Sequence, residues 1–350
     1  MRTARVRRLT LIPFVLLVLA LGWPALRAST VDAASDQEYI ALGDSIAAGQ
    51  ITSLPSARGY PALVTKQLQT LASTEGSPGR VRLADLAVPG ETAETFVTNG
   101  QLDAFKNEIA SVKSQGTELR LITITLGGND LLNLANVGTA DRQAGLDRFK
   151  TQYPAAINDV RQTLGDLKPV IVVTTYYDLS GSDPARQGSD AWWVAQFNDV
   201  IRSTAQTDGL KVADLEQDFR GHIMDWTWFP TDEHPNNAGH AEIARLVWAA
   251  AGLDQEPPTV KIDKPDAGQL SRDIPTIAVT AHDNVGVTGV DLWVDDTHVT
   301  SLIYVPSRQQ YIGVWDSRTA SSEKTTLSIR VTDLAGHTST ATVDVTRPSS

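Results

Sequence analysis

Short apolar runs alternate with longer amphipathic segments between about residue 38 and residue 253, and this alternation constrains the fold more than any other feature of the chain. The amphipathic segments carry apolar residues at helical spacing, whereas the apolar runs have the length of single strands. Strands that alternate with helices form βαβ units, in which a parallel sheet is covered by helices on both faces. The predicted strands are residues 39–42, 81–87, 119–126, 170–175 and 210–213. The predicted helices are residues 60–72, 94–113, 141–166, 191–207 and 238–251.

The pattern changes at the Pro257-Pro258 pair. Beyond it the chain contains short alternating runs rich in Val and Thr, separated by turn residues, which predicts a β-sandwich of roughly immunoglobulin size. Consecutive prolines make a stiff linker. We therefore expect a first domain at residues 34–253, a linker at 254–258 and an all-β domain at 259–350. The strands predicted in the second domain are residues 259–262, 276–280, 287–294, 311–315, 326–331 and 340–345.

The first 33 residues have the composition of a secretory signal peptide. Several arginines precede the apolar run 9–21, and small residues follow it. An uncleaved membrane anchor is the alternative, because the run approaches the length of a membrane span. Pro13, Gly22 and Pro24 interrupt the apolar stretch and favour cleavage. We therefore predict a secreted protein.

Charge and cysteine content exclude several classes of function. The chain has a formal net charge of −11, whereas phosphate binding needs clustered Lys and Arg, so nucleic acid is not an expected partner. The chain has no cysteine. This excludes a disulfide framework, a thiol nucleophile and a zinc site with Cys ligands.

Four short polar segments follow predicted strands of the first domain. They contain Ser45 after the first strand, Gly90 after the second, Asn129 after the third and His234 between the last strand and the last helix. In parallel sheets the carboxyl ends of the strands meet at one edge, where ligands bind. Each segment taken singly is typical of an ordinary turn, and the joint placement is what favours a site.

These four residue types fit together chemically. Ser45 comes after Gly43, which allows a sharp turn, and before a helix-like segment, whose N-terminal N–H groups would stabilise negative charge. Gly90 can turn its N–H toward a ligand because it has no side chain. The Asn129 amide can stabilise an oxyanion, and His234 can act as a general base.

The order Gly-Asp-Ser, Gly, Gly-x-Asn-Asp and His-Pro resembles the four sequence blocks of SGNH (GDSL-type) hydrolases over residues 38–252. The resemblance implies a flavodoxin-like three-layer α/β/α sandwich with about five parallel strands. It also implies that Ser45 is the nucleophile and His234 the base. The oxyanion hole implied by the resemblance consists of the Ser45 N–H, the Gly90 N–H and the Asn129 side chain.

The sequence departs from the family pattern next to the histidine. The family's orienting Asp usually stands three residues before the His, but that position here is Thr231. Either Asp232 takes this role through a shifted turn, or the Thr231 carbonyl accepts the hydrogen bond from the His234 ring. We favour Asp232, which is the only Asp of this loop.

Aromatic residues near the predicted site have two interpretations. Trp226, Trp228 and Phe229 precede His234 and are candidates for lining an acyl pocket or for packing against the last helix. The polar stretch 180–189 ahead of Trp192 and Trp193 is a candidate flap, and helix packing is the alternative.

The second domain also resembles a known family. The segments Asp283-Asn-Val-Gly-Val287 and Val331-Thr-Asp-Leu-Ala-Gly336 are similar to those of bacterial Ig-like modules appended to secreted proteins. Such a module is a candidate for binding a cell-surface or polysaccharide partner.

The interpretation that follows is a secreted serine ester hydrolase that cleaves acyl or acetyl esters through an acyl-serine intermediate. Its substrate is a small-molecule, lipid or polysaccharide ester. The alternative is a non-catalytic surface or polysaccharide-binding protein whose hydrolase domain is a relic. We predict no cofactor, and we predict no metal at the cluster Asp232, Glu233 and His234, because no further ligand stands at the usual spacing.

Overall fold

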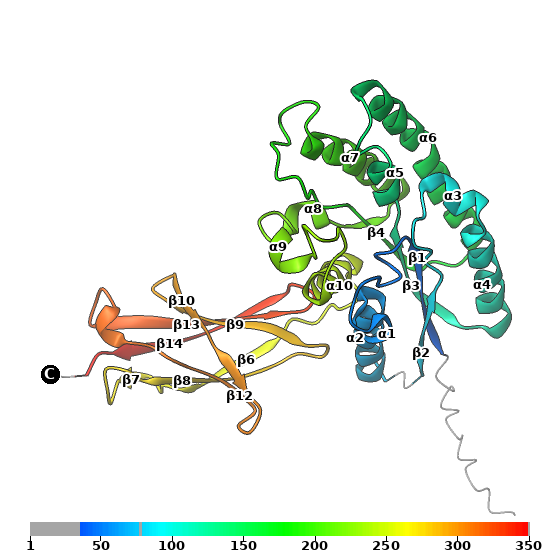
Figure 1. Cartoon of the computed structure of the whole chain (residues 1–350). Helices are drawn as coiled ribbons and strands as arrows, with labels where there is room; N and C mark the ends of the chain where they lie inside the picture. The colour runs from blue at the N-terminus through cyan, green and yellow to red at the C-terminus, as the bar shows by residue number, and fades with distance from the viewer. Residues whose placement is uncertain (1–35, 77–78, 349–350) are drawn as a thin grey trace, which may run out of the picture. The chain divides into compact units, whose positions relative to one another are not determined.

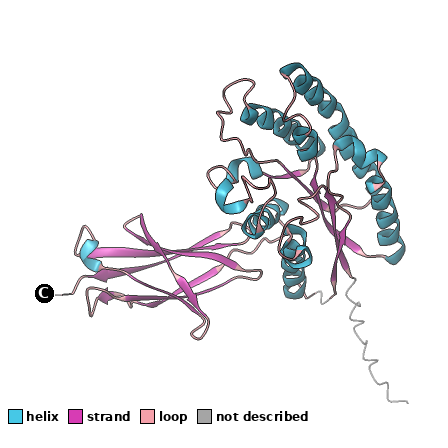
Figure 2. Cartoon of the chain, in the orientation of Figure 1, coloured by secondary structure: helices cyan, strands magenta, loops and turns pink. Residues whose placement is uncertain are grey.

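A five-stranded parallel sheet is the centre of the first part of the chain (Figures 1 and 2). The computed structural model describes residues 36–76 and 79–348, so the predicted signal peptide lies outside the described residues. The strand order is β2-β1-β3-β4-β5, and every neighbouring pair is parallel. The strands are β1 (Gln37–Gly43), β2 (Val81–Asp85), β3 (Glu118–Thr125), β4 (Val170–Thr174) and β5 (Lys211–Ala213).

Helices cover both faces of this sheet, which confirms the predicted three-layer α/β/α fold (Figure 1). Helices α2 and α10 pack against each other on one face, and α4, α6 and α7 pack together on the other. The longer helices are α2 (Tyr60–Thr74), α4 (Gln101–Gln115), α6 (Thr139–Leu164), α7 (Asp190–Asp208) and α10 (Asn237–Ala251). The shorter ones are α1 (Pro55–Arg58), α3 (Ala93–Thr98), α5 (Gly128–Leu132), α8 (Leu215–Asp218) and α9 (Ile223–Trp226).

The central strands explain why the apolar runs are continuous rather than alternating. All seven residues of β1 are buried, and so are the last five residues of β3. A parallel strand with helices on both faces buries both sides of its pleat, so it needs apolar or hydrogen-bonded residues at successive positions. Tyr39 shows how a polar group is accommodated there, because its hydroxyl lies 2.7 Å from the Thr123 hydroxyl.

One predicted helix is two helices in the structure. The segment predicted at 94–113 is divided into α3 and α4, which are separated at Gly100. Gly100 has a φ of +99°, a left-handed conformation that ends one helix and allows the chain to start the next. The amphipathic spacing continues through this break, and so the apolar pattern alone did not reveal it.

The second part of the chain consists of two β-sheets, as predicted for an Ig-like sandwich. Their strand orders are β10-β9-β13-β14-β7 and β11-β12-β8-β6, and all pairs except β7 with β14 are antiparallel. Buried apolar side chains from both sheets form its core, including Ile277, Leu292 and Ile329. The six predicted strands correspond to β6 (Thr259–Lys264), β8 (Thr276–His282), β9 (Val287–Val294), β12 (Gln310–Val314), β13 (Lys324–Asp333) and β14 (Thr338–Thr346). Three short strands were not predicted from the sequence: β7 (Gly268–Gln269), β10 (Thr297–Ser301) and β11 (Ile303–Val305).

None of the helices in the described part of the chain is both long enough and apolar enough to cross a membrane.

Candidate active site

Ser45 lies in the turn that follows strand β1. The strand ends at Gly43, whose φ of +125° is a conformation that L side chains rarely adopt. A Cβ at this position would lie 2.0 Å from the Thr125 carbonyl oxygen, so only glycine lets β1 and β3 approach this closely. The Asp44 N–H donates to the same oxygen at 3.0 Å. This exit from the sheet leaves Ser45 at the carboxyl edge, where it is 8% exposed.

The prediction that Ser45 opens a helix is wrong. Residues 45–50 form successive turns, and the next helix, α1, begins only at Pro55. Gly49 has a φ of +67°, which interrupts any right-handed helix at that point. Stabilisation of negative charge at Ser45 therefore depends on individual N–H groups and not on a helix terminus.

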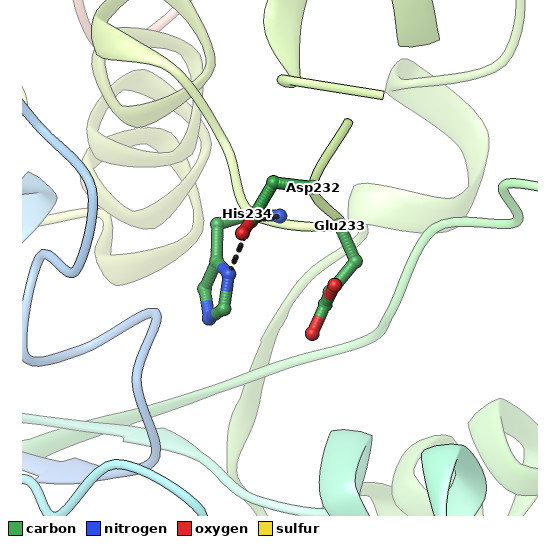
Figure 3. A group of neighbouring side chains, drawn as sticks. All are labelled: Asp232, Glu233 and His234. Atoms are coloured by element: carbon green, nitrogen blue, oxygen red, sulfur yellow. Dashed lines mark hydrogen bonds and ion pairs between the residues drawn. The ribbon is translucent and has the colours of Figure 1, made fainter. Parts of the chain in front are cut away.

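His234 connects Ser45 with Asp232. The His234 Nε2 lies 2.8 Å from the Ser45 Oγ, and the His234 Nδ1 lies 2.6 Å from the Asp232 Oδ1. Figure 3 shows the contact between the ring and the carboxylate. When Nδ1–H donates to the carboxylate, Nε2 presents a lone pair that accepts the hydrogen bond of the serine hydroxyl. This is the arrangement of a nucleophile, a base and the group that orients the base.

The loop of His234 is fixed by the helix that follows it. The Asn236 side chain caps α10 by accepting hydrogen bonds from the N–H groups of Ala238 and Gly239. The Trp228 N–H donates to the His234 carbonyl at 3.0 Å. Because backbone bonds on both sides hold the loop, the His234 side chain, which is 12% exposed, is held over Ser45.

Asp232 binds His234 at two points. Its Oδ1 also accepts the His234 backbone N–H at 2.8 Å. Partial burial would raise the pKa of the Asp232 carboxyl, but these hydrogen bonds and the charge of His234 outweigh it and hold that pKa below its ordinary value. The carboxylate is therefore ionised at neutral pH. The structure pairs the ring with Asp232 and not with the Thr231 carbonyl, and the Thr231 hydroxyl donates to the Trp228 carbonyl at 2.6 Å.

Gly90 lies on the loop that follows β2, and Asn129 is the second residue of the short helix α5, which follows β3; β2 and β3 are the strands that flank β1. The Asn129 Nδ2 donates to the Glu91 carbonyl at 3.0 Å, which leaves its second N–H for another acceptor. Asn129 lines the same cleft as Ser45 and His234. Gly90 has a φ of +85° and is exposed at the neighbouring loop, outside the residues that line this cleft. Among the described residues, neither the Gly90 N–H nor the Ser45 N–H has a hydrogen-bond acceptor.

Gln101 joins the serine turn to the Gly90 loop and was not predicted from the sequence. It is 2% exposed. Its Oε1 accepts the Gly43 N–H at 2.7 Å, and its Nε2 donates to the Gly43 carbonyl and to the Glu91 Oε2, both at 2.9 Å. One amide therefore fixes the serine turn relative to the Gly90 loop. A single Gln at the start of a helix carries no sequence signal for such a role.

Asp44 faces the interior beneath the serine. It is 2% exposed, and its two oxygens accept hydrogen bonds from the Tyr176 hydroxyl at 2.6 Å and from the Thr125 hydroxyl at 3.0 Å. Burial raises the pKa of the Asp44 carboxyl although these bonds oppose the change. The contacts fix the turn from below, which gives Asp44 a structural role.

His240, the other histidine near the site, is a core residue. It is fully buried in α10, and its Nδ1 accepts the Tyr60 N–H at 3.3 Å. Burial, with a further contribution from the charge of His234, lowers the pKa of His240 to about 4, so its ring is neutral at physiological pH.

Two hollows meet beside Ser45. A narrow cleft of about 70 Å³ contains Ser45, Asn129 and His234. A second cavity of about 310 Å³ lies next to it and is lined mainly by apolar side chains. The residues that line both are Leu131, Leu132, Tyr177 and Leu179.

Some of the aromatic residues near the predicted site line a cavity, and others pack against neighbouring side chains. Phe229 and Trp193 line the larger cavity. Trp226 instead packs edge-to-face on Phe219 and stacks on His222.

The carboxylates and imidazole of Asp232, Glu233 and His234 offer three ligand atoms within 4.8 Å of one another. Two of these side chains are already engaged, because Asp232 binds the ring of His234 and that ring contacts Ser45. The Glu233 carboxylate lies near the ring, but no dashed line joins the two in Figure 3. The geometry therefore favours proton transfer at Ser45 over metal binding at this cluster.

Comparisons with known proteins agree with this architecture. The model of the GDSL-like lipase/acylhydrolase family matches residues 41–242, and that of a bacterial Ig domain matches residues 258–343. A search of curated proteins found no match.

Solved structures similar to this chain include three hydrolases. An alpha/beta hydrolase from the metagenome of Lake Arreo, Spain, is 21% identical, with 63% of this chain and 98% of that chain covered and a TM-score of 0.46. An acetylxylan esterase from Geobacillus stearothermophilus is 17% identical, with 63% and 97% covered and a TM-score of 0.48. An extracellular lipase from Streptomyces rimosus is 21% identical, with 61% and 99% covered and a TM-score of 0.41.

Asp232→Asn tests the pairing of the histidine ring. This change keeps the size of the side chain but removes the negative charge that stabilises the imidazolium, so we expect turnover of an ester to fall by as much as roughly ten-thousand-fold. Asp225→Asn makes the same substitution at an exposed position that lines neither hollow, and it should leave turnover within about twofold of the wild type. Steady-state kinetics on both variants, with circular dichroism to verify folding, decide the question. Near wild-type turnover in Asp232→Asn would show that a backbone group orients His234.

Proposed function

The chain belongs to the GDSL-like lipase/acylhydrolase family, and from this premise we propose that it is an exported serine hydrolase of carboxylic esters. The observation that carries the proposal is the unbroken contact chain at the sheet edge. Ser45 Oγ lies 2.8 Å from His234 Nε2, and His234 Nδ1 lies 2.6 Å from Asp232 Oδ1. A serine is a weak nucleophile unless a base accepts its proton, and these contacts supply that base.

The proposed reaction proceeds through an acyl-serine. Ser45 Oγ attacks the ester carbonyl while its proton passes to His234 Nε2, and the carbonyl oxygen acquires negative charge. Asp232 stabilises the imidazolium that forms. His234 then donates the proton to the departing alcohol. Water repeats the sequence on the acyl-enzyme, which releases the acid and restores Ser45.

Three N–H groups are proposed to hold the oxyanion. They belong to the Ser45 backbone, the Gly90 backbone and the Asn129 side chain. The two backbone N–H groups have no acceptor among the described residues, which supports this role. The Asn129 amide donates one of its two hydrogens to the Glu91 carbonyl, so the second is free for the oxyanion. Preorganised donors of this kind are usually the largest single term in catalysis of acyl transfer.

The apolar cavity beside Ser45 supports an acyl chain as the group that the site binds. It holds about 310 Å³ and shares Leu131, Tyr177 and Leu179 with the catalytic cleft. An acetyl group would fill only the small cleft. We therefore propose an ester of a medium or long acyl chain as the substrate class, in preference to an acetylated polysaccharide.

Export is the remaining part of the proposal. It is supported by the basic and apolar composition of the first 33 residues.

An ester assay on the purified protein tests the proposed reaction. We expect hydrolysis of p-nitrophenyl octanoate that Ser45→Ala abolishes without loss of fold, because the change removes one oxygen from an edge position. Asn129→Ala should reduce turnover by roughly 100- to 1000-fold, the usual loss for one oxyanion donor. Unchanged turnover in Ser45→Ala would overturn the assignment of the nucleophile, and an inactive wild type would favour the non-catalytic alternative.

The acyl cavity predicts a chain-length preference. Each buried methylene contributes about 0.8 kcal/mol, so kcat/KM should rise at least about tenfold from the acetate to the octanoate ester. Leu179→Trp narrows the passage between cleft and cavity, and it should lower kcat/KM for octanoate about tenfold or more while acetate changes less than about threefold. Leu246→Trp, a half-buried leucine on α10 that lines neither hollow, is the matched control. Equal losses on both esters in Leu179→Trp would contradict an acyl-binding role for the cavity.

A further inference from the structure

Three aspartates from distant parts of the sequence converge behind the end of helix α10. Asp254 lies three residues after that helix, Asp283 lies between β8 and β9, and Asp333 is the last residue of β13. One carboxylate oxygen from each lies within 4.8 Å of the others. Asp254 is 0% exposed, Asp333 is 2% exposed and Asp283 is half-buried, so the group is not a solvated acidic surface.

Three of the six carboxylate oxygens in this cluster accept backbone N–H groups, and one of them is the Asp333 Oδ1, which accepts the His337 N–H at 2.8 Å. The Asp254 Oδ1 accepts the Glu256 N–H at 3.2 Å and the Asn284 Nδ2–H at 3.1 Å. The Asp283 Oδ2 accepts the N–H groups of Val285 and Gly286 at 2.9 and 2.8 Å. These bonds orient the two carboxylates and hold the Asn284 amide beside them.

Three further oxygens of this group have no hydrogen-bond partner among the described residues. Asp254 Oδ2, Asp283 Oδ1 and Asn284 Oδ1 are all buried without a hydrogen bond. A buried polar atom left unpaired costs about 1–3 kcal/mol, and more when it carries charge. Three such atoms on side chains of one cluster, one of them on a fully buried carboxylate, indicate a bound group that several oxygens can coordinate at once.

The charge of the cluster leads to the same conclusion. No Lys or Arg forms an ion pair with these three aspartates anywhere in residues 36–76 and 79–348. Within these described residues, the basic side chain at the cluster is His337, whose Nδ1 lies 2.9 Å from the Asp333 Oδ2. Like charges within 5 Å in a buried site repel strongly, and burying a charge without a partner is unfavourable. A bound cation removes both penalties.

We infer that Asp254, Asp283, Asn284 and Asp333 form a calcium-binding site. All available donors are oxygens, which hard cations prefer, and the chain has no cysteine for a softer metal. Two oxygens that bind one Ca²⁺ at 2.3–2.6 Å lie at most about 5 Å apart, and the three carboxylates satisfy this limit. Mg²⁺ demands stricter octahedral geometry and usually binds one or two carboxylates with several waters, so a cage of three carboxylates and an amide favours Ca²⁺.

The ion would stabilise the connection between the two parts of the chain. It joins the segment after α10 to two loops of the β-sheets, and Val285, Leu334 and Ala335 from those loops pack against the core of the first part. Both parts belong to one compact unit of the chain. This inference goes beyond the proposed ester hydrolysis and does not depend on it.

Calorimetric titration of CaCl2 into the full chain, after treatment with EGTA and removal of the chelator, tests the site. We expect one Ca²⁺ per chain with a Kd between about 10⁻⁷ and 10⁻³ M, and a melting temperature that rises with Ca²⁺ concentration. Asp254→Asn should weaken Ca²⁺ binding at least about tenfold, since it removes a ligand charge. Glu256→Gln changes the same charge two residues away at an exposed position, and it should bind Ca²⁺ like the wild type.

Asp283→Asn tests the site independently if Asp254→Asn does not fold. Asp283→Asn keeps an oxygen for the Val285 and Gly286 N–H groups, so the turn survives while the ligand charge is lost, and Ca²⁺ binding should weaken as well. If titration with Ca²⁺ produced no binding heat and Ca²⁺ did not change the melting temperature, the proposed site would be overturned. Unchanged binding in folded Asp254→Asn or Asp283→Asn would overturn its ligands, and tighter binding of MgCl2 than of CaCl2 would overturn the identity of the ion. The readout is binding to the chain, so an inactive esterase would leave this result unaffected.

Discussion

The close approach of strands β1 and β3 at Gly43 and Thr125 is the constraint on which the candidate site depends. A side chain at Gly43 would collide with a main-chain oxygen, which cannot move without disrupting β3. This contact sets the direction in which the chain leaves the sheet, with Asp44 turned inward and Ser45 turned toward the cleft. Gln101 then binds both polar groups of Gly43 and extends the same constraint to the Gly90 loop through Glu91.

Much of this arrangement could be predicted because it depends on local sequence patterns. Buried parallel strands require unbroken apolar runs, so the sheet could be identified from the run lengths and spacing. Strand ends converge at one edge, which is why Ser45, Asn129 and His234 could be associated although they are far apart in sequence. The contact of Asp232 with His234 was expected for a simpler reason, since both belong to one short loop.

The features that escaped prediction depend on tertiary contacts that leave no local pattern. The helix expected after Ser45 does not form, because Gly49 adopts a left-handed conformation. Gln101 acts only because folding brings Gly43 and Glu91 to its amide. The Asp254, Asp283 and Asp333 group joins three segments whose separations match no common metal motif, and only the orphaned oxygens in the folded chain identify it.

The central claim is that Ser45 is a nucleophile activated by His234, and covalent labelling tests it most directly. The protein is incubated with a p-nitrophenyl alkylphosphonate, which mimics the tetrahedral intermediate, and then digested and analysed by mass spectrometry. The account predicts one phosphonyl adduct per chain, on the peptide that contains Ser45, with labelling lost in Ser45→Ala and slowed in His234→Ala. An adduct on another residue, or labelling at the same rate without the His234 imidazole, would contradict it.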